Sequence, residues 1–136
     1  MSTTTDIHPA IARAAEAFND HDVDGYVAEF AEEGTFLDPV QDDELTKAEI
    51  RGYVTKMLEA FPDVRIEEER VIASDDETAM EATFHATHKG EFDGIPPTGE
   101  TVAVPFVSII TVSDNGITSW RDYWNQEAFA EQIGLE

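Results

Sequence analysis

Residues 102–112 constrain the fold more than any other stretch, because they are apolar at almost every position. The apolar side chains of this predicted strand fall on both of its faces, with Val104, Phe106 and Ile110 on one and Val107 and Ile109 on the other. A single layer of helices covers only one face of a sheet. The simplest partner for the other face is a second copy, which predicts a homodimer through the outer sheet face. Pro105 cannot donate to a strand ladder and predicts a bulge or a local edge.

A second long strand follows directly. Asp114-Asn115-Gly116 is typical of a tight turn and leads into residues 117–125. Because side chains alternate along a strand, Trp120, Asp122 and Trp124 share one face, and a carboxyl group lies between two indole rings. Asp122 is therefore a candidate acid or base.

The size and charge of the chain limit the classes of function. The 136 residues, 41% of them apolar, predict one domain over residues 1–136. Its 30 acidic side chains against 8 basic ones give a formal charge of −22. Phosphate binding needs clustered Lys and Arg, so we expect neither nucleic acid nor a membrane as a partner. The carboxylates are dispersed along the chain, which resembles the proteins of salt-accumulating halophiles, where salt screens their repulsion.

Several chemistries lack the residues that they need. The chain has no cysteine, which excludes disulfides, thiol catalysis and Cys-ligated zinc. No spacing resembles a calcium loop or a pair of zinc-binding histidines, so we expect no metal and no cofactor. The first residues carry no basic and apolar signal, and no long apolar run occurs, which predicts a cytoplasmic protein.

The rest of the sequence predicts helices first and strands afterwards. Apolar residues at helical spacing predict helices over residues 8–19 and 22–30, the second ended by Gly34 before a short strand over residues 35–39. Thr46-Lys47-Ala48-Glu49 matches a capping box that opens a third helix. A hairpin of residues 64–73 and 78–88 precedes the two long strands, and residues 127–133 form a terminal helix. The order predicts an α+β fold with a mainly antiparallel sheet.

Two strings of residues resemble a known family. Thr87-His88-x-Gly90-x-Phe92-x-Gly94-x-Pro96-Pro97-Thr98-Gly99 and the closing Phe129-x-x-Gln132-Ile133-Gly134-Leu135 are similar to the SnoaL-like polyketide cyclases of the nuclear transport factor 2-like superfamily. The resemblance covers nearly the whole chain and implies a cone-shaped cup, in which a curved sheet wraps three N-terminal helices. The superfamily hosts enzymes of several kinds and non-catalytic proteins, so the fold alone does not define the function.

The last long strand is also similar to the closing strand of the limonene-epoxide hydrolases of the same superfamily. In both families the matching aspartate is the acid/base residue, which implies that role for Asp122. The resemblance further implies a substrate-binding cup lined by Phe36, Asp38, Val104, Phe106, Ser108, Trp120, Trp124 and Phe129.

The departures from both families concern the partner of Asp122. The hydrolases pair their aspartate with an Arg and a second Asp, whereas residues 78–88 offer Glu81, Thr83 and His85 on one face. The cyclases carry a His near the position of Ser108. His85 is therefore the candidate second catalytic residue.

Structural interpretations stand beside these functional ones. Asp122 could form an ion pair with Arg121 or Arg51, and His85 could be a hydrogen-bonded histidine on the dimer face. We expect His88 to hold the loop that follows it by a hydrogen bond. Gly94 to Gly99 should form a rigid turn at the mouth of the cup.

The resemblance implies a cofactor-free cyclase-type enzyme that acts on a small to medium hydrophobic carbonyl compound by an intramolecular aldol reaction or related proton transfer. The first alternative is a non-catalytic module of the same fold for small-molecule binding or dimerisation. An isomerase or an epoxide hydrolase is a further alternative, and the missing Arg and Asp argue against the hydrolase.

Overall fold

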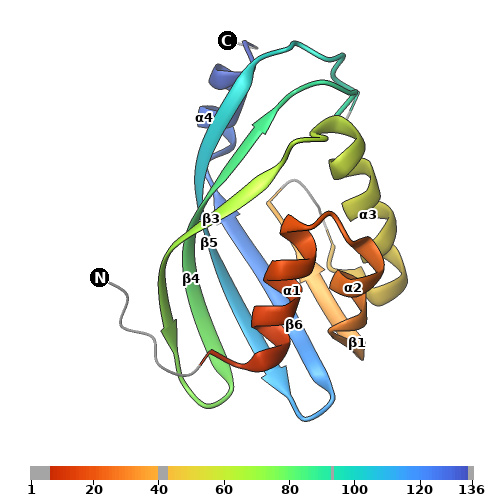
Figure 1. Cartoon of the computed structure of the whole chain (residues 1–136), viewed down its shortest axis with the longest axis vertical. Helices are drawn as coiled ribbons and strands as arrows, with labels where there is room; N and C mark the ends of the chain where they lie inside the picture. Colours follow the sequence, from red (N-terminus) through yellow and green to blue (C-terminus); the bar gives the residue numbers. More distant parts are fainter. Residues whose placement is uncertain (1–6, 40–42, 93, 135–136) are drawn as a thin grey trace.

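The computed structural model describes residues 7–39, 43–92 and 94–134. Figure 1 shows the N-terminal helices on the concave side of a curved sheet and another helix near the C-terminus. In chain order the elements are α1 (Pro9–Asn19), α2 (Val23–Ala28), β1 (Phe30–Leu37), β2 (Leu45–Thr46), α3 (Lys47–Ala60), β3 (Arg65–Ala73), β4 (Glu77–Thr87), β5 (Thr101–Ser113), β6 (Gly116–Trp124) and α4 (Gln126–Gln132).

The six strands form one sheet in the order β2-β1-β6-β5-β4-β3. Every neighbouring pair is antiparallel except β1 and β6, which run parallel. The parallel pair places the first strand of the chain beside the last one in the curved sheet (Figure 1), whose two edges are β2 and β3. The predicted α+β class and the mainly antiparallel cup are confirmed.

The core fills the space between the helices and the concave face in two clusters. One cluster lies under α1, α2 and α3 and includes the fully buried Ile11, Ile50 and Ile110. The second surrounds Phe61 at the end of α3 and includes Phe129 of α4. These residues come from the apolar stripes of the helices and from alternate positions of the strands, as amphipathic elements require.

The predicted capping box opens α3. Thr46 accepts a hydrogen bond from the Glu49 amide at 3.4 Å, and the Glu49 carboxylate accepts one from the Thr46 amide at 2.9 Å. The box satisfies two backbone donors that a helix start leaves without partners. It fixes the start of the helix that forms one wall of the cup.

The prediction that the second helix runs to residue 30 and that Gly34 stops it is wrong. The helix α2 ends at Ala28, and Phe30 already begins β1, where it pairs with Ile117 of β6. A side chain at Gly34 would place its Cβ 2.5 Å from the Ile117 carbonyl oxygen. Gly34 therefore allows the two strands to approach at the irregularity between Phe30 and Thr35, and it has no role as a helix stop.

Of the two alternatives predicted for Pro105, a bulge or a local edge, the structure shows the local edge. The pairing of β5 with β6 ends at Phe106, one residue after the proline, and the pairing with β4 continues without a bulge. On the N-terminal side of Pro105, where β6 no longer pairs with β5, the Gln132 side chain of α4 forms hydrogen bonds with the β5 backbone. Its amide accepts from the Ala103 N–H at 2.6 Å and donates to the Ala103 carbonyl at 3.0 Å.

The loop between β4 and β5 is held as predicted. The His88 ring is buried, and its Nδ1 lies 3.1 Å from the Thr98 hydroxyl and accepts from the Thr98 amide at 3.3 Å. Gly94 and Gly99 both have positive φ, at 83° and 76°, which explains glycine at these turn positions. The loop keeps Phe92 against Phe61 and Phe129 at the edge of the cup.

Candidate active site

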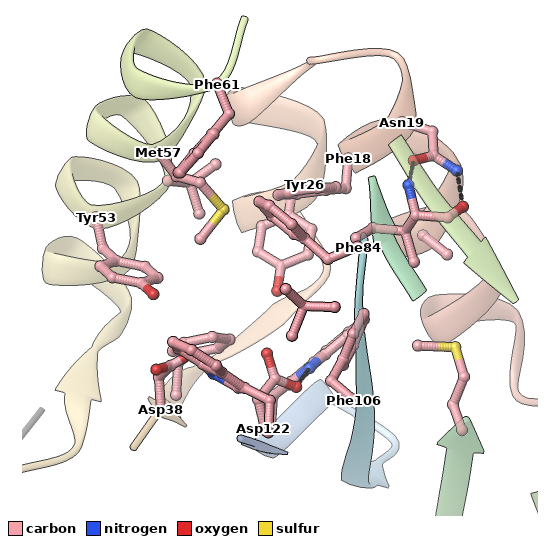
Figure 2. Close-up of a pocket in the computed structure, with 18 of the residues that line it drawn as sticks. Phe18, Asn19, Tyr26, Asp38, Tyr53, Met57, Phe61, Phe84, Phe106 and Asp122 are labelled. Atoms are coloured by element: carbon pink, nitrogen blue, oxygen red, sulfur yellow. Dashed lines mark hydrogen bonds between the residues drawn. The ribbon is translucent and has the colours of Figure 1, made fainter. Parts of the chain in front are cut away.

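A cavity of about 110 Å³ lies between the helices and the concave face of the sheet. A single water needs about 10–15 Å³ on the same measure, so the space admits a small organic molecule. Figure 2 shows side chains from α1, α2 and α3 on one side and from the strands on the other. The aromatic residues that line the cavity are Phe18, Tyr26, Phe36, Tyr53, Phe61, Phe84, Phe92, Phe106, Trp120, Trp124 and Phe129.

Asp122 projects into this cavity from β6. Its position pairs with Ser108 of β5, so the two side chains lie side by side on the concave face. The Ser108 hydroxyl donates to Oδ1 of Asp122 at 2.5 Å, and Nε1 of Trp120 donates to the same oxygen at 2.9 Å. In the described part of the chain both hydrogen bonds end on Oδ1, and the second oxygen points toward the cavity (Figure 2).

The surroundings of Asp122 raise the pKa of its carboxyl group from 3.8 to about 7. Burial is the largest cause, because an apolar cavity solvates the charged form poorly. The hydrogen bond from Ser108 lowers the pKa, the negative charge of Asp38 raises it, and the hydrogen bond from Trp120 lowers it. The result is a carboxyl group that can exchange a proton near neutral pH.

Asp38 is the second carboxylate at the cavity and follows the end of β1. It is only 4% exposed and accepts a hydrogen bond from Nε1 of Trp124 at 3.1 Å. The parallel pairing of β1 with β6 produces this contact between residues 86 positions apart. Two acids and two indoles therefore occupy one end of the cavity.

The structure brings most of the predicted site residues together. The predicted residues that line the cavity are Phe36, Asp38, Val104, Phe106, Trp120, Asp122, Trp124 and Phe129. Ser108 is fully buried behind Asp122 and reaches the site through its hydrogen bond to the carboxylate.

His85 is the predicted site residue that the structure does not bring to Asp122. Its neighbour Phe84 lines the cavity, so alternation along β4 turns His85 to the outer face of the sheet. There its Nε2 lies 2.8 Å from a carboxylate oxygen of Glu67. This position matches the alternative interpretation of a hydrogen-bonded histidine on the outer face.

The alternative in which Asp122 forms an ion pair with arginine is wrong. Arg51 pairs with Asp24 on the surface of the helices. Arg121 follows Trp120 in β6 and faces away from the cavity, as alternation requires. Among the described residues that line the cavity, none is a Lys, Arg or His, and the acidic ones are Asp38, Glu68 and Asp122.

Sequence reasoning did not identify two tyrosines of the site. Tyr26 and Tyr53 lie on the inward stripes of α2 and α3, where they count as apolar core residues in a periodicity argument. Burial raises the pKa of both hydroxyls, and the negative charges of Asp122 at Tyr26 and of Asp38 at Tyr53 add to the effect. The hydroxyl group was the one signal in the sequence that could have distinguished these tyrosines from core residues, because a buried tyrosine usually needs a hydrogen-bond partner.

Metal sites and membrane-spanning helices are both absent from the part of the chain that the structure describes. Over residues 7–39, 43–92 and 94–134, no group of three or more acidic or histidine side chains is placed to hold a metal ion. In the same ranges no helix is long and apolar enough to cross a membrane.

The cup-shaped sheet, the helices on its concave face and the apolar cavity define a nuclear transport factor 2-like fold. Among solved structures, AclR, a proposed hydroxylase from Streptomyces galilaeus, is 26% identical with a TM-score of 0.81 over 93% of this chain and 94% of that chain. IdmH, a proposed polyketide cyclase from Streptomyces antibioticus, is 22% identical with a TM-score of 0.79 over 92% and 96%. A ketosteroid isomerase-like protein from Catenulispora acidiphila, solved with trimethylamine, is 20% identical with a TM-score of 0.82 over 96% of each chain.

A sequence profile of the SnoaL-like polyketide cyclases matches residues 9–133, and the chain belongs to this family. No curated protein matches it in sequence. The family supports a function of the cyclase or isomerase type and a small hydrophobic substrate.

Proposed function

We propose that this protein is a cofactor-free cyclase-type enzyme in which Asp122 is the general acid and base for a small to medium hydrophobic carbonyl compound. The observation that carries the proposal is a carboxyl group with a pKa of about 7 whose second oxygen opens into an apolar cavity (Figure 2). A base works best when its pKa lies near the working pH, since enough of it is ionised and it still accepts a proton readily.

One carboxyl group can carry the whole proton cycle. The ionised Asp122 takes a proton from the carbon next to a substrate carbonyl, and the C–H electron pair moves to the carbonyl oxygen as an enolate. The enolate carbon then attacks a second carbonyl of the same molecule, and the new alkoxide takes the proton back from Asp122. The aromatic walls would hold the substrate folded and exclude water.

The lining of the cavity also favours one charge class of substrate. A ligand with a carboxylate or phosphate would meet the negative charges of Asp38 and Asp122 with no basic side chain among the described lining residues. A neutral carbonyl compound avoids this repulsion. The proposed substrate is therefore uncharged where it enters the cavity.

The experiment is deuterium exchange at the carbon next to the carbonyl of 2-tetralone, a neutral hydrophobic ketone, followed by proton NMR in D₂O. We expect the wild-type protein to accelerate exchange and Asp122→Asn to lose at least about 100-fold of the acceleration, the usual contribution of a general base. Asp75→Asn, the same change in the exposed turn between β3 and β4, is the matched control and should retain it.

The other possible results of this experiment would favour a different function or a different base. Binding of the ketone without accelerated exchange in the wild type would favour the non-catalytic binding module. Exchange that persists in Asp122→Asn would remove Asp122 from the mechanism. An isomerase would show exchange and then movement of a double bond in an unsaturated ketone.

We also propose that the outer face of the sheet binds a second copy of the chain. Val107 and Ile109 lie half-buried on this face, and Tyr123 next to them is 52% exposed. Apolar side chains on an open face favour an isologous dimer. Sedimentation velocity at micromolar concentration tests it, and a purely monomeric protein would contradict it.

A further inference from the structure

A carbonyl oxygen that becomes an enolate needs a hydrogen-bond donor beside it, and most donors at the cavity are already used. Nε1 of Trp120 donates to Asp122, and Nε1 of Trp124 donates to Asp38. The Asn19 side chain is bound at both ends to the backbone of Ile66, at 3.0 Å and 2.8 Å. The Tyr53 hydroxyl is hydrogen-bonded to Asp38, so the Tyr26 hydroxyl is the donor that remains among the described residues that line the cavity.

Tyr26 is the tyrosine placed over Asp122. Figure 2 shows its hydroxyl directed toward the Asp122 carboxylate from the opposite side of the cavity. The residue is 4% exposed, and burial and the charge of Asp122 act on its hydroxyl, with no hydrogen bond to another described residue. The hydroxyl lines the cavity and can donate a hydrogen bond to a molecule bound there.

The Tyr26 ring is held rigidly. It makes edge-to-face contacts with Phe18, Phe30 and Trp120, with ring centroids 5.7, 5.4 and 5.6 Å apart. Such contacts fix the direction of the hydroxyl before a substrate arrives. A donor that is already oriented stabilises developing charge without a reorganisation cost.

The protonation state of Tyr26 suits a donor. Burial, followed by the negative charge of Asp122, raises the pKa of its hydroxyl well above the usual value. The group therefore keeps its proton over the neutral range. Tyr53 differs, because its hydroxyl lies beside Asp38, and that carboxylate competes for the proton.

We propose that Tyr26 is a further catalytic residue, whose hydroxyl donates a hydrogen bond to the substrate carbonyl oxygen while Asp122 removes the neighbouring proton. The inference rests on the proposed function and names the group that stabilises the enolate. No proton leaves Tyr26: the C–H bond breaks, the proton goes to Asp122, and the oxygen that gains the electron pair accepts the hydrogen bond.

The direct test is the infrared stretch of the carbonyl of 2-tetralone labelled with ¹³C at that carbon and bound to the protein. A hydrogen bond from Tyr26 lowers this frequency below its value in an apolar solvent. We expect Tyr26→Phe to return the frequency to the solvent value, while the outer-face variant Tyr123→Phe leaves it lowered. The exchange rate of Tyr26→Phe should fall by about 10²–10³-fold, the usual loss for one such donor.

The outcomes separate this inference from the function on which it rests. A lowered frequency that persists in Tyr26→Phe, with exchange still dependent on Asp122, would overturn the role of Tyr26 and leave the proposed function intact. A wild-type protein that neither binds the ketone nor exchanges its protons would overturn both. Because Tyr26→Phe keeps the ring and its three aromatic contacts, a folded variant is expected, and circular dichroism confirms it.

Discussion

At the scale of single residues, the site places two polar groups where they cost stability. Asp122 and Tyr26 face each other across an apolar space. Burial there solvates the charged form of each group less well than water would, which raises both pKa values. Natural proteins keep such residues when activity requires them. The sequence predicted Asp122 because alternation alone places it between two indoles. It could not predict that the Tyr26 hydroxyl faces Asp122, since this position depends on elements that meet only in the folded chain.

The cost of Asp122 should appear as a pH-dependent difference in stability. Its pKa is about 7 in the folded protein against an ordinary 3.8, so the folded state binds the proton more tightly between these values. The unfavourable contribution is therefore full above pH 7 and disappears as the pH falls toward 4. We expect Asp122→Asn to be more stable than the wild type by about 2–4 kcal/mol at pH 8, since one pKa unit is about 1.4 kcal/mol and the partial exposure of Asp122 to solvent reduces the effect.

Urea unfolding of both proteins at pH 8 and at pH 4 measures this difference. We expect the stability advantage of Asp122→Asn to be smaller at pH 4 than at pH 8. An equal stability advantage at both pH values, or a variant that is less stable than the wild type at pH 8, would show that ionised Asp122 does not destabilise the folded protein.

At the scale of helices and strands, local signals predicted the elements whose cause is local. The capping box at Thr46 and the turn before Gly116 depend on neighbouring residues, and both are where the sequence places them. The start of β1 at Phe30 was missed because it depends on pairing with Ile117, a contact between distant parts of the chain.

The position of His85 illustrates a second limit of local reasoning. Alternation predicts that His85 shares a face with Thr83, and the structure agrees. Which of the two faces meets the helices is decided by packing over the whole sheet, and a one-residue change in register would exchange them. The sequence therefore grouped the residues of β4 correctly but could not assign the group to the cavity.

At the scale of the whole molecule, repulsion among carboxylates is the main electrostatic feature. The chain carries a formal charge of −22. Within the described residues the ion pairs of Lys and Arg with carboxylates are Arg13–Glu29, Arg51–Asp24 and Arg70–Glu81. Most of the acidic side chains that the structure describes thus form no ion pair, and we propose that the protein is adapted to high salt.

This proposal predicts a strong dependence of stability on salt. The screening length falls from about 10 Å at 0.1 M to about 3 Å at 1 M, which removes most repulsion between surface carboxylates. We expect the melting temperature to rise by at least about 5 °C between these concentrations of KCl, equivalent to about 1–2 kcal/mol. Sucrose at matched osmolality is the control without screening, and an equal rise in sucrose and KCl, or none in KCl, would contradict the proposal.

The measurement that tests the central claim most directly is the pKa of the Asp122 carboxyl by carbon-13 NMR titration, with the signal assigned by its loss in Asp122→Asn. We expect a midpoint near 7, because burial at the apolar cavity disfavours the charged form of the carboxyl group. A midpoint at or below the ordinary value of about 4 would mean a solvated structural carboxylate and would contradict the acid/base role.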